Sequence, residues 1–344
     1  MSISQSYETQ EAHDGALRMF LDYADVTERD NVICLFDPSL EGIENFLRGV
    51  LAEISAQGIV VEATSDLDIL SSYNELTALF LFQRTSSLFS KEIARDKHLW
   101  RAYRVFDAVP DLFGECFRIP KCQIEELHTA LITVLGNSKE LRIKSSGGTD
   151  LEIIFNQDFG WLSSYGISDG NVGVMPPSEI ATYSAQVNGV MIADGAINAN
   201  FEFPGDPRLH EYPIMLEFHN SNLVNFQCPD PFLYLSISSF LASPNARCIG
   251  EVGFGTNFGL RSFVPFLSHI NERYPGLHIG LGSHNQGNRL DWFAPLHLDF
   301  IPHKSNIIAD GFEVMSNGLY NLEMLKERAR TLPKIKVSVV PDTL

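Results

Sequence analysis

Positive charge is scarce in this sequence of 344 residues. Lysine and arginine together number 25 against 43 aspartates and glutamates, the formal net charge is −18, and no cluster of basic residues occurs. Proteins that bind duplex nucleic acid or anionic lipid surfaces need a concentrated basic region. We therefore expect neither nucleic acid nor a membrane as a partner. An acidic protein is compatible with a cationic ligand or a metal ion.

Long apolar runs and paired cysteines are missing as well. No uninterrupted apolar stretch reaches the roughly 18 residues of a transmembrane helix, and the segment Met1 to Gly15 is polar and acidic, unlike a secretory signal. The five cysteines are odd in number and form no CxxC pair, which favours reduced thiols over a disulfide framework or a zinc ribbon. These absences predict a cytoplasmic protein.

Familiar catalytic and nucleotide-binding motifs are missing or lack the structural context that they need. Neither GxGxxG nor GxxxxGK[ST] follows the first expected strand, which argues against nucleotide binding there. The one GxSxG match, Gly166-Ile-Ser-Asp-Gly170, has no expected strand directly before it and no expected helix directly after it, which argues against catalysis by a Ser-His-Asp triad.

The first part of the chain predicts an α/β domain over residues 1–136. An apolar strand at Asn31–Phe36, an amphipathic helix over 40–57 and a strand at Gly58–Ala63 form a strand-helix-strand unit, which implies a parallel sheet. A further strand is expected over 76–82, with helices over 12–23, 86–105 and 123–135. We expect this domain to serve packing or dimerisation, and the protein to be a homodimer.

The second part, residues 137–344, predicts a β-rich domain. Short apolar runs alternate with Gly, Pro and Asn, and they give expected strands over 142–144, 151–155, 187–193, 214–218 and 233–238. A charged helix is expected over 322–330. The fold class is therefore α/β, with a small N-terminal α/β domain and a β-rich C-terminal domain.

Three segments between Arg247 and Lys304 place metal-ligand residue types in apolar runs punctuated by glycine. They are Gly250–Asn257, Leu277–Ser283 and Pro295–Phe300, and they contain Glu251, His278, His297 and Asp299. His297 and Asp299 share one face of a strand, because residues two apart point the same way. A lone buried histidine beside glycine is more often a hydrogen-bonded core residue. Three such segments together favour an N/O site suited to Zn, Mn, Fe or Co.

Five motifs in this order resemble the M29 family, the metal-dependent aminopeptidases of the aminopeptidase T type. The motifs are Gly147-Gly-Thr-Asp-Leu151, Met175-Pro-Pro-Ser-Glu179, Gly250-Glu-Val-Gly-Phe-Gly-Thr-Asn257, His278-Ile-Gly-Leu-Gly-Ser283 and His297-Leu-Asp299. The resemblance covers roughly 140–320, and the N-terminal domain only in outline. It implies an aminopeptidase T-like fold.

The resemblance also implies two divalent ions, Zn, Co or Mn, held between carboxylates and histidines. By motif the ligands are Glu179, Glu251, His278, His297 and Asp299, with Glu251 as the bridging carboxylate. Ser178 stands where the family has glycine before the first glutamate. The implied function is metal-dependent hydrolysis, in which a metal-activated water attacks a peptide or small amide bond and Glu179 or Glu251 accepts its proton.

One departure concerns the residue that stabilises the oxyanion. The family has a tyrosine seven residues after the His278 equivalent, and this chain has Asn285 there, preceded by His284. An amide or imidazole also donates a hydrogen bond to an oxyanion, so Asn285 and His284 are the catalytic candidates. We expect a narrower substrate than that of a general aminopeptidase, a small peptide or small-molecule amide.

Two alternatives remain open. The 2,5-dihydroxypyridine 5,6-dioxygenases are similar at His297-Leu-Asp299 and in the glycine-rich motif that begins at Glu251, where they carry a histidine that completes an Fe(II) site. The first alternative is therefore a non-peptidase metalloenzyme, such as an Fe(II) ring-cleaving dioxygenase or a dedicated biosynthetic enzyme. The second is a degenerate, metal-free binding protein. Glu217 and His219 are either pocket-lining or surface residues.

Overall fold

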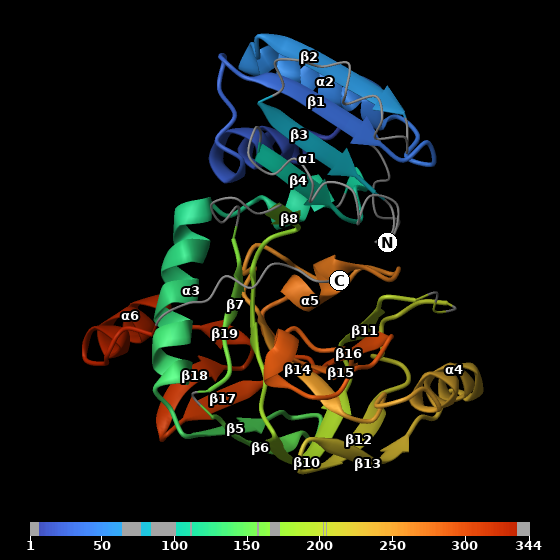
Figure 1. The fold of residues 1–344 in the computed structure, drawn as a ribbon, viewed down its shortest axis with the longest axis vertical. Helices are drawn as coiled ribbons and strands as arrows, with labels where there is room; N and C mark the ends of the chain where they lie inside the picture. Colours follow the sequence, from blue (N-terminus) through green and yellow to red (C-terminus); the bar gives the residue numbers. More distant parts are fainter. Residues whose placement is uncertain are drawn as a thin grey trace. The chain divides into compact units, whose positions relative to one another are not determined.

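The computed structural model describes residues 7–63, 77–83, 101–165 and 173–335, apart from positions 111, 157, 202 and 204. The chain divides into two compact units, drawn in Figure 1. Unit 1 comprises the described residues of Met1–Gln123 and Ser164–Pro177, and unit 2 those of Ile124–Ser163 and Ser178–Val340. The division falls inside helix α3 (Lys121–Gly136). The sequence boundary after residue 136 stays a prediction.

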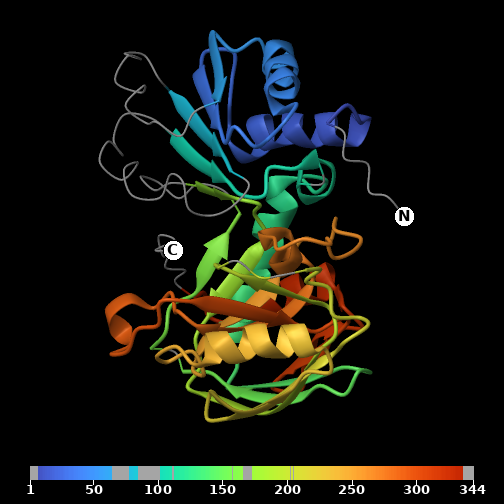
Figure 2. The same cartoon turned by 90° about the vertical axis from the view of Figure 1, so that its right-hand side faces the viewer.

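Unit 1 is built on a parallel sheet with strand order β2-β1-β3-β4-β8. Its strands are β1 (Asn31–Phe36), β2 (Gly58–Ala63), β3 (Ala78–Phe82), β4 (Arg101–Val105) and β8 (Gly173–Met175). Its helices are α1 (Gln10–Arg18), continued by a π-helical turn Met19–Tyr23, then α2 (Ile43–Ile54) and a second π-helical turn Leu112–Cys116. Helices α1 and α2 lie on the same face of the sheet (Figure 2). The expected strand-helix-strand unit is confirmed as β1-α2-β2.

The helix expected over 86–105 is wrong for its last five residues. Residues 84–100 lie outside the described part of the chain, but Arg101–Val105 form strand β4, which pairs with β3 and β8. Ala102, Tyr103 and Val105 are buried in this strand. Pairing with a strand on each side, together with burial, decides the conformation of this short segment. The local sequence pattern does not reveal either of them.

Unit 2 contains two antiparallel sheets, and these match the expected β-rich character. In sheet order, the eight-stranded sheet consists of β13 (Asn222–Gln227), β12 (Ile214–His219), β10 (Gln186–Ala193), β6 (Asp150–Ile154), β5 (Glu140–Lys144), β17 (Asn306–Ala309), β18 (Phe312–Ser316) and β19 (Leu319–Tyr320). The six-stranded sheet consists of β11 (Ala196–Ala199), β16 (His297–Ile301), β15 (Gly276–Gly282), β14 (Ile249–Gly255), β9 (Glu179–Thr182) and β7 (Leu162–Ser164). Besides α3, the unit has α4 (Pro231–Leu241), α5 (His269–Arg273), α6 (Leu322–Arg330) and a 3-10 turn Gly287–Arg289.

The strand expected over 233–238 is wrong, because this segment lies in helix α4. The Asp230 carboxylate accepts hydrogen bonds of 2.8 Å from the backbone N–H groups of Phe232 and Leu233. Pro231 occupies the first helical position. An N-cap aspartate followed by proline is a helix-start signal, and it outweighs the strand-like alternation of the residues after it.

One hydrophobic core contains apolar side chains from both sheets of unit 2, from α3 and from α4. In the six-stranded sheet, the core-facing residues recur every second position, as in Leu277, Ile279 and Leu281 of β15 and Leu298 and Phe300 of β16. Side chains alternate between the faces of a strand. The residues between the core positions therefore lie on the opposite face of this sheet. Within the described part of the chain, no helix has the length and apolar character needed to cross a membrane.

Candidate metal centre

The structure brings the five predicted ligands together on one face of the six-stranded sheet. They come from four neighbouring strands: Glu179 from β9, Glu251 from β14, His278 from β15, and His297 and Asp299 from β16. Each is directly followed in its strand by a residue of the hydrophobic core. The period-two pattern that buries one face in the core therefore gathers these five side chains on the other.

Glycines on the same face make the space for these side chains. Gly280 lies between Glu251 and Asp299 in the register of the sheet, and Gly253 lies opposite His278. A Cβ atom on Gly280 would lie 2.5 Å from His297 Cε1 and 2.8 Å from Asp299 Oδ1, and one on Gly253 would overlap the His278 ring. Such approaches are too close for any side chain. The glycines are therefore part of the site.

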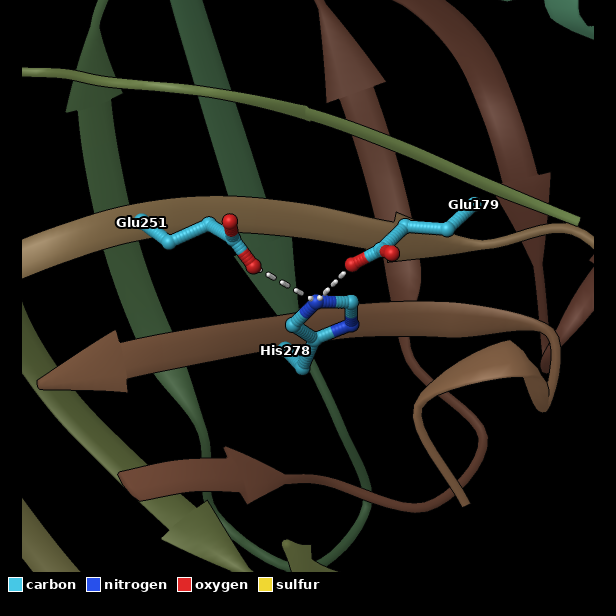
Figure 3. Close-up of side chains that lie close together, drawn as sticks. All are labelled: Glu179, Glu251 and His278. Atoms are coloured by element: carbon cyan, nitrogen blue, oxygen red, sulfur yellow. Dashed lines mark hydrogen bonds and ion pairs between the residues drawn. The ribbon is translucent and has the colours of Figure 1, made fainter. Parts of the chain in front are cut away.

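The first group of potential ligands consists of Glu179, Glu251 and His278, whose ligand atoms lie within 4.8 Å of one another. Figure 3 shows both carboxylates directed at the His278 ring. His278 Nε2 is 2.9 Å from Glu179 Oε1 and 3.3 Å from Glu251 Oε1. The His278 side chain is 1% exposed, the Glu179 side chain 9% and the Glu251 side chain 15%.

The second group consists of Glu251, His297 and Asp299, so Glu251 belongs to both. His297 Nε2 is 2.9 Å from Asp299 Oδ1, and His297 Nδ1 is 2.9 Å from the backbone carbonyl of Ser283. A histidine that ligates a metal through one nitrogen typically donates the other N–H to a carbonyl or carboxylate, and His297 has this arrangement. Asp299 Oδ2 is buried with no hydrogen-bond partner within the described part of the chain.

The histidines of both groups are held in a charged state by the acidic residues around them. Burial lowers the pKa of His278, but Glu179 and Glu251 outweigh it and raise this pKa well above its ordinary value. Burial also lowers the pKa of His297, and the charge and hydrogen bond of Asp299 raise it to about 10. The acidic neighbours thus favour a proton on both imidazoles. Because metal ligands must be deprotonated, an ion entering the site would release these protons.

The carboxylates respond to these neighbours in different ways. Burial raises the pKa of Glu179, but the Arg273 guanidinium and the His278 hydrogen bond outweigh it and hold the pKa at about 2. Burial likewise raises the pKa of Asp299, and His297 overcomes this and holds the pKa well below its usual range. The pKa of Glu251 is raised by burial, which its hydrogen bond with His278 opposes.

Three buried residues beside the site had not been predicted: Asn198, Glu272 and Arg273. Arg273 Nη1 contacts Glu179 Oε2 and lies 2.9 Å from Glu272 Oε2. The Asn198 side chain donates to Glu272. Burial and the nearby Asp299 charge raise the pKa of Glu272 to about 8. Arg273 and Glu179 are 94 positions apart, and no local pattern in the sequence signals their contact.

The two predicted catalytic residues lie in different surroundings. Asn285 donates from Nδ2 to Glu251 Oε2 at 2.9 Å, and its Oδ1 accepts from Gln286 Nε2 at 2.8 Å. His284 Nε2 lies 2.7 Å from the backbone carbonyl of Trp292, and the two rings pack edge to face. Asn285 is thus in direct contact with the glutamate that both ligand groups share. A catalytic role for Asn285 or for His284 stays a prediction.

Two further acidic and imidazole side chains lie elsewhere. Glu217 and His219 are exposed on β12, a strand of the eight-stranded sheet. They are surface residues rather than part of the cluster on the six-stranded sheet.

Comparison with known proteins gives likeness at the level of structure only. No protein-family model matches the chain, and no curated protein sequence matches it. Among solved structures, 2,5-dihydroxypyridine dioxygenase from Pseudomonas putida KT2440 is similar with a TM-score of 0.62 and 16% identity, covering 90% of this chain and 96% of that one. Wild-type AmpT from Thermus thermophilus is similar with a TM-score of 0.60 and 13% identity, covering 92% of this chain and 100% of that one.

The chain shares the fold of these two proteins. The aminopeptidase T-like fold that the sequence motifs implied is therefore confirmed, and both similar structures span nearly the whole chain. The donor set itself also fits a divalent cation. It offers imidazole and carboxylate ligands, a carboxylate oxygen of Asp299 that has no hydrogen-bond partner among the described residues, and glycines that leave room for the ligands.

Proposed function

We propose that this protein is a metal-dependent hydrolase that cleaves a peptide or small amide bond. The observation that carries the proposal is the position of Glu251, which offers a ligand atom to both groups of the site. Two ions held about 3.5–4 Å apart use such a shared carboxylate, as in many two-metal hydrolases. Glu179 and His278 complete one half of the site, and His297 and Asp299 complete the other.

Bound divalent ions would supply a water of lowered pKa and would polarise a carbonyl group. The carboxylate oxygens that face His278, Glu179 Oε1 and Glu251 Oε1, are the candidates to accept the water proton and pass it to the leaving amine. Asn285 holds Glu251 by its other oxygen. In this arrangement Asn285 fixes the orientation of the shared carboxylate.

The exposure of the five side chains indicates the side from which the substrate approaches. Glu251 is 15% and His297 11% exposed, whereas His278 and Asp299 are 1% exposed. Glu179, at 9%, is close to His297 in exposure, so a substrate meets these three ligands before His278 and Asp299. The amide of Asn285 lies beside Glu251 and can hydrogen-bond a polar substrate. This suits the small amide or short peptide that the sequence resemblance implies.

The test loads chelator-treated protein with Zn²⁺, Co²⁺, Mn²⁺ or Fe²⁺ in turn and assays aminoacyl amides and short peptides. We expect release of amine with at least one of these metals. Glu251→Gln should lower kcat by at least about a hundredfold, because it removes the charge of the shared ligand. Glu217→Gln, on the exposed face of β12, is the matched control and should keep full activity. Stoichiometric metal binding without any amide cleavage would contradict the hydrolase.

A second candidate function follows from one observation, the likeness in fold to a solved 2,5-dihydroxypyridine dioxygenase. In that case the site would hold one Fe²⁺ and the reaction would consume oxygen. An oxygen electrode with Fe²⁺-loaded protein and dihydroxylated aromatic rings separates the two functions. Oxygen uptake that depends on the ring substrate would favour the dioxygenase over the hydrolase.

A further inference from the structure

A buried guanidinium distinguishes the two halves of the site. Arg273, with a side chain that is 4% exposed, contacts Glu179, a member of the first ligand group. It also contacts Glu272, which offers no atom to either group. The carboxylates of the second group have other partners, since Glu251 accepts from the neutral amide of Asn285 and Asp299 pairs with His297.

We propose that Arg273 makes the two halves of the site unequal, so that a first divalent ion binds at Glu251, His297 and Asp299 and a second binds more weakly at Glu179, Glu251 and His278. The inference rests on the proposed metal site and adds an order of occupancy to it. The residue responsible is not itself a ligand.

The first argument is charge. An arginine side chain stays protonated in proteins and is not titrated away by an incoming ion. It neutralises Glu179 and repels a divalent cation at the same time. Because the contact is buried, mobile salt ions screen this repulsion little. The second group has two carboxylates and, within the described part of the chain, no contact with an arginine, so it offers an ion the larger negative charge.

The second argument is the number of free ligand atoms and their orientation. Arg273 takes up Glu179 Oε2, which leaves Oε1 for an ion. Asp299, by contrast, keeps a buried Oδ2 without a hydrogen-bond partner among the described residues. His297 is held through Nδ1 by the Ser283 carbonyl, which leaves Nε2 directed into the site. The second group is therefore the better prepared to receive an ion.

The experiment titrates chelator-treated full-length protein with Co²⁺ alone and follows heat and the visible absorption of bound Co²⁺. We expect two binding events whose dissociation constants differ by at least about tenfold. Glu179→Gln should remove the weaker event and keep the tighter one. Asp299→Asn, a substitution of the same kind in the other half, should remove the tighter event.

Two substitutions of Arg273 test its charge directly. Arg273→Lys keeps the positive charge, so the two dissociation constants should stay apart. Arg273→Met removes the charge, so the weaker event should tighten toward the stronger. Because Arg273→Met leaves two buried carboxylates without their partner, far-UV circular dichroism must first show that it folds. If it does not fold, the Glu179→Gln and Asp299→Asn variants alone test which half of the site binds Co²⁺ more tightly.

The possible failures are distinguishable. Two equal dissociation constants, or loss of the tighter event in Glu179→Gln, would overturn the inequality and leave the metal site in place. No Co²⁺ binding by the unmodified protein would overturn the proposed metal site and this inference together.

Discussion

At the scale of single residues, the two glutamates of the site are distinguished by what holds their outer oxygens. Glu179 contacts the guanidinium of Arg273, and Glu251 accepts from the amide of Asn285. Both direct their remaining oxygen at His278 Nε2. On our proposal, the charged donor at Glu179 and the neutral donor at Glu251 give these two chemically identical side chains different affinities for a cation. Asn285 would keep this positioning role whether the reaction is hydrolytic or oxidative.

A buried histidine near the site predicts a measurable dependence of stability on pH. His128 of α3 is hydrogen-bonded through Nδ1 to Ser163 Oγ at 2.9 Å and through Nε2 to Thr256 Oγ1 at 2.6 Å. Burial lowers its pKa to about 3, whereas a histidine in the unfolded chain titrates near 6.5. Between these values the unfolded state binds one more proton. The contribution of His128 to the free energy of unfolding is therefore complete above about pH 6.5 and is lost as pH falls toward 3.

The matched comparison is His128→Gln, which keeps hydrogen-bonding capacity but does not titrate. We expect the free energy of unfolding of the unmodified protein to fall more steeply than that of the variant, by up to about 1.4 kcal/mol per pH unit. Urea unfolding at pH 6.5, 5.5 and 4.5 measures both slopes. The other titrating groups contribute equally to the free energy of unfolding of both proteins, so their effects cancel in the comparison. Parallel slopes would mean that His128 takes up its proton in the folded protein as well.

Residue-level prediction succeeds where geometry is local. His297 and Asp299 are two apart on one strand, so their shared face follows from strand periodicity alone. Arg273 and Glu272 are neighbours in the sequence that look like an ordinary surface charge pair, and only the tertiary fold brings Arg273 to Glu179. The same reason explains why Asn198 was missed. A contact that forms only because two distant segments become neighbours in the fold cannot be predicted from the spacing of residues in the sequence.

At the scale of elements, the site depends on how closely neighbouring strands present their side chains. Gly280 of β15 stands between Glu251 of β14 and Asp299 of β16. A strand interior ordinarily disfavours glycine, because it adds conformational freedom and packs no side chain. Here its missing Cβ leaves the space that His297 and Asp299 fill.

Gly280→Ala is therefore expected to weaken Co²⁺ binding by at least about tenfold, because the new methyl group displaces ligands from their geometry. Calorimetric titration measures the binding, and circular dichroism checks the fold. The control is Gly49→Ala in α2, where an added Cβ meets nothing within 4 Å. That change should leave binding unaltered and stabilise the helix by about 0.5–1 kcal/mol. Unchanged Co²⁺ affinity in Gly280→Ala would place the metal away from His297 and Asp299.

Elements could be predicted where the sequence carries a start signal or a clear period, as for β1, β2 and α6. Helix α4 was mistaken for a strand because its apolar residues alternate, although Asp230-Pro231 marks a helix start. The strand order β11-β16-β15-β14-β9-β7 of the six-stranded sheet, by contrast, depends on pairing between distant segments. No short-range pattern specifies it. The glycine-punctuated segments alone favoured a shared site for Glu251, His278, His297 and Asp299, and the family resemblance added Glu179.

At the scale of the whole molecule, the candidate site belongs to one unit. All five ligands and Arg273 lie in the residues of unit 2, and the parallel sheet of unit 1 contributes none of them. Any ligand that binds the native state alone stabilises it by mass action, by about 2.7 kcal/mol at a free concentration of 100 times its dissociation constant. The stabilisation acts on the part of the chain whose unfolding destroys the site.

This gives a prediction for hydrogen exchange of the intact protein with excess Co²⁺ and with a chelator. Backbone amides of β9, β14, β15 and β16 should exchange up to about a hundredfold more slowly with the metal, because opening these strands releases the ion. Amides of β1 and β3 should exchange at the same rate in both samples, since unit 1 contains none of the five residues proposed to bind the metal. Equal slowing in both units would show that they unfold together and that metal binding stabilises the whole chain. No slowing in the four strands of unit 2 would mean that Co²⁺ binds elsewhere.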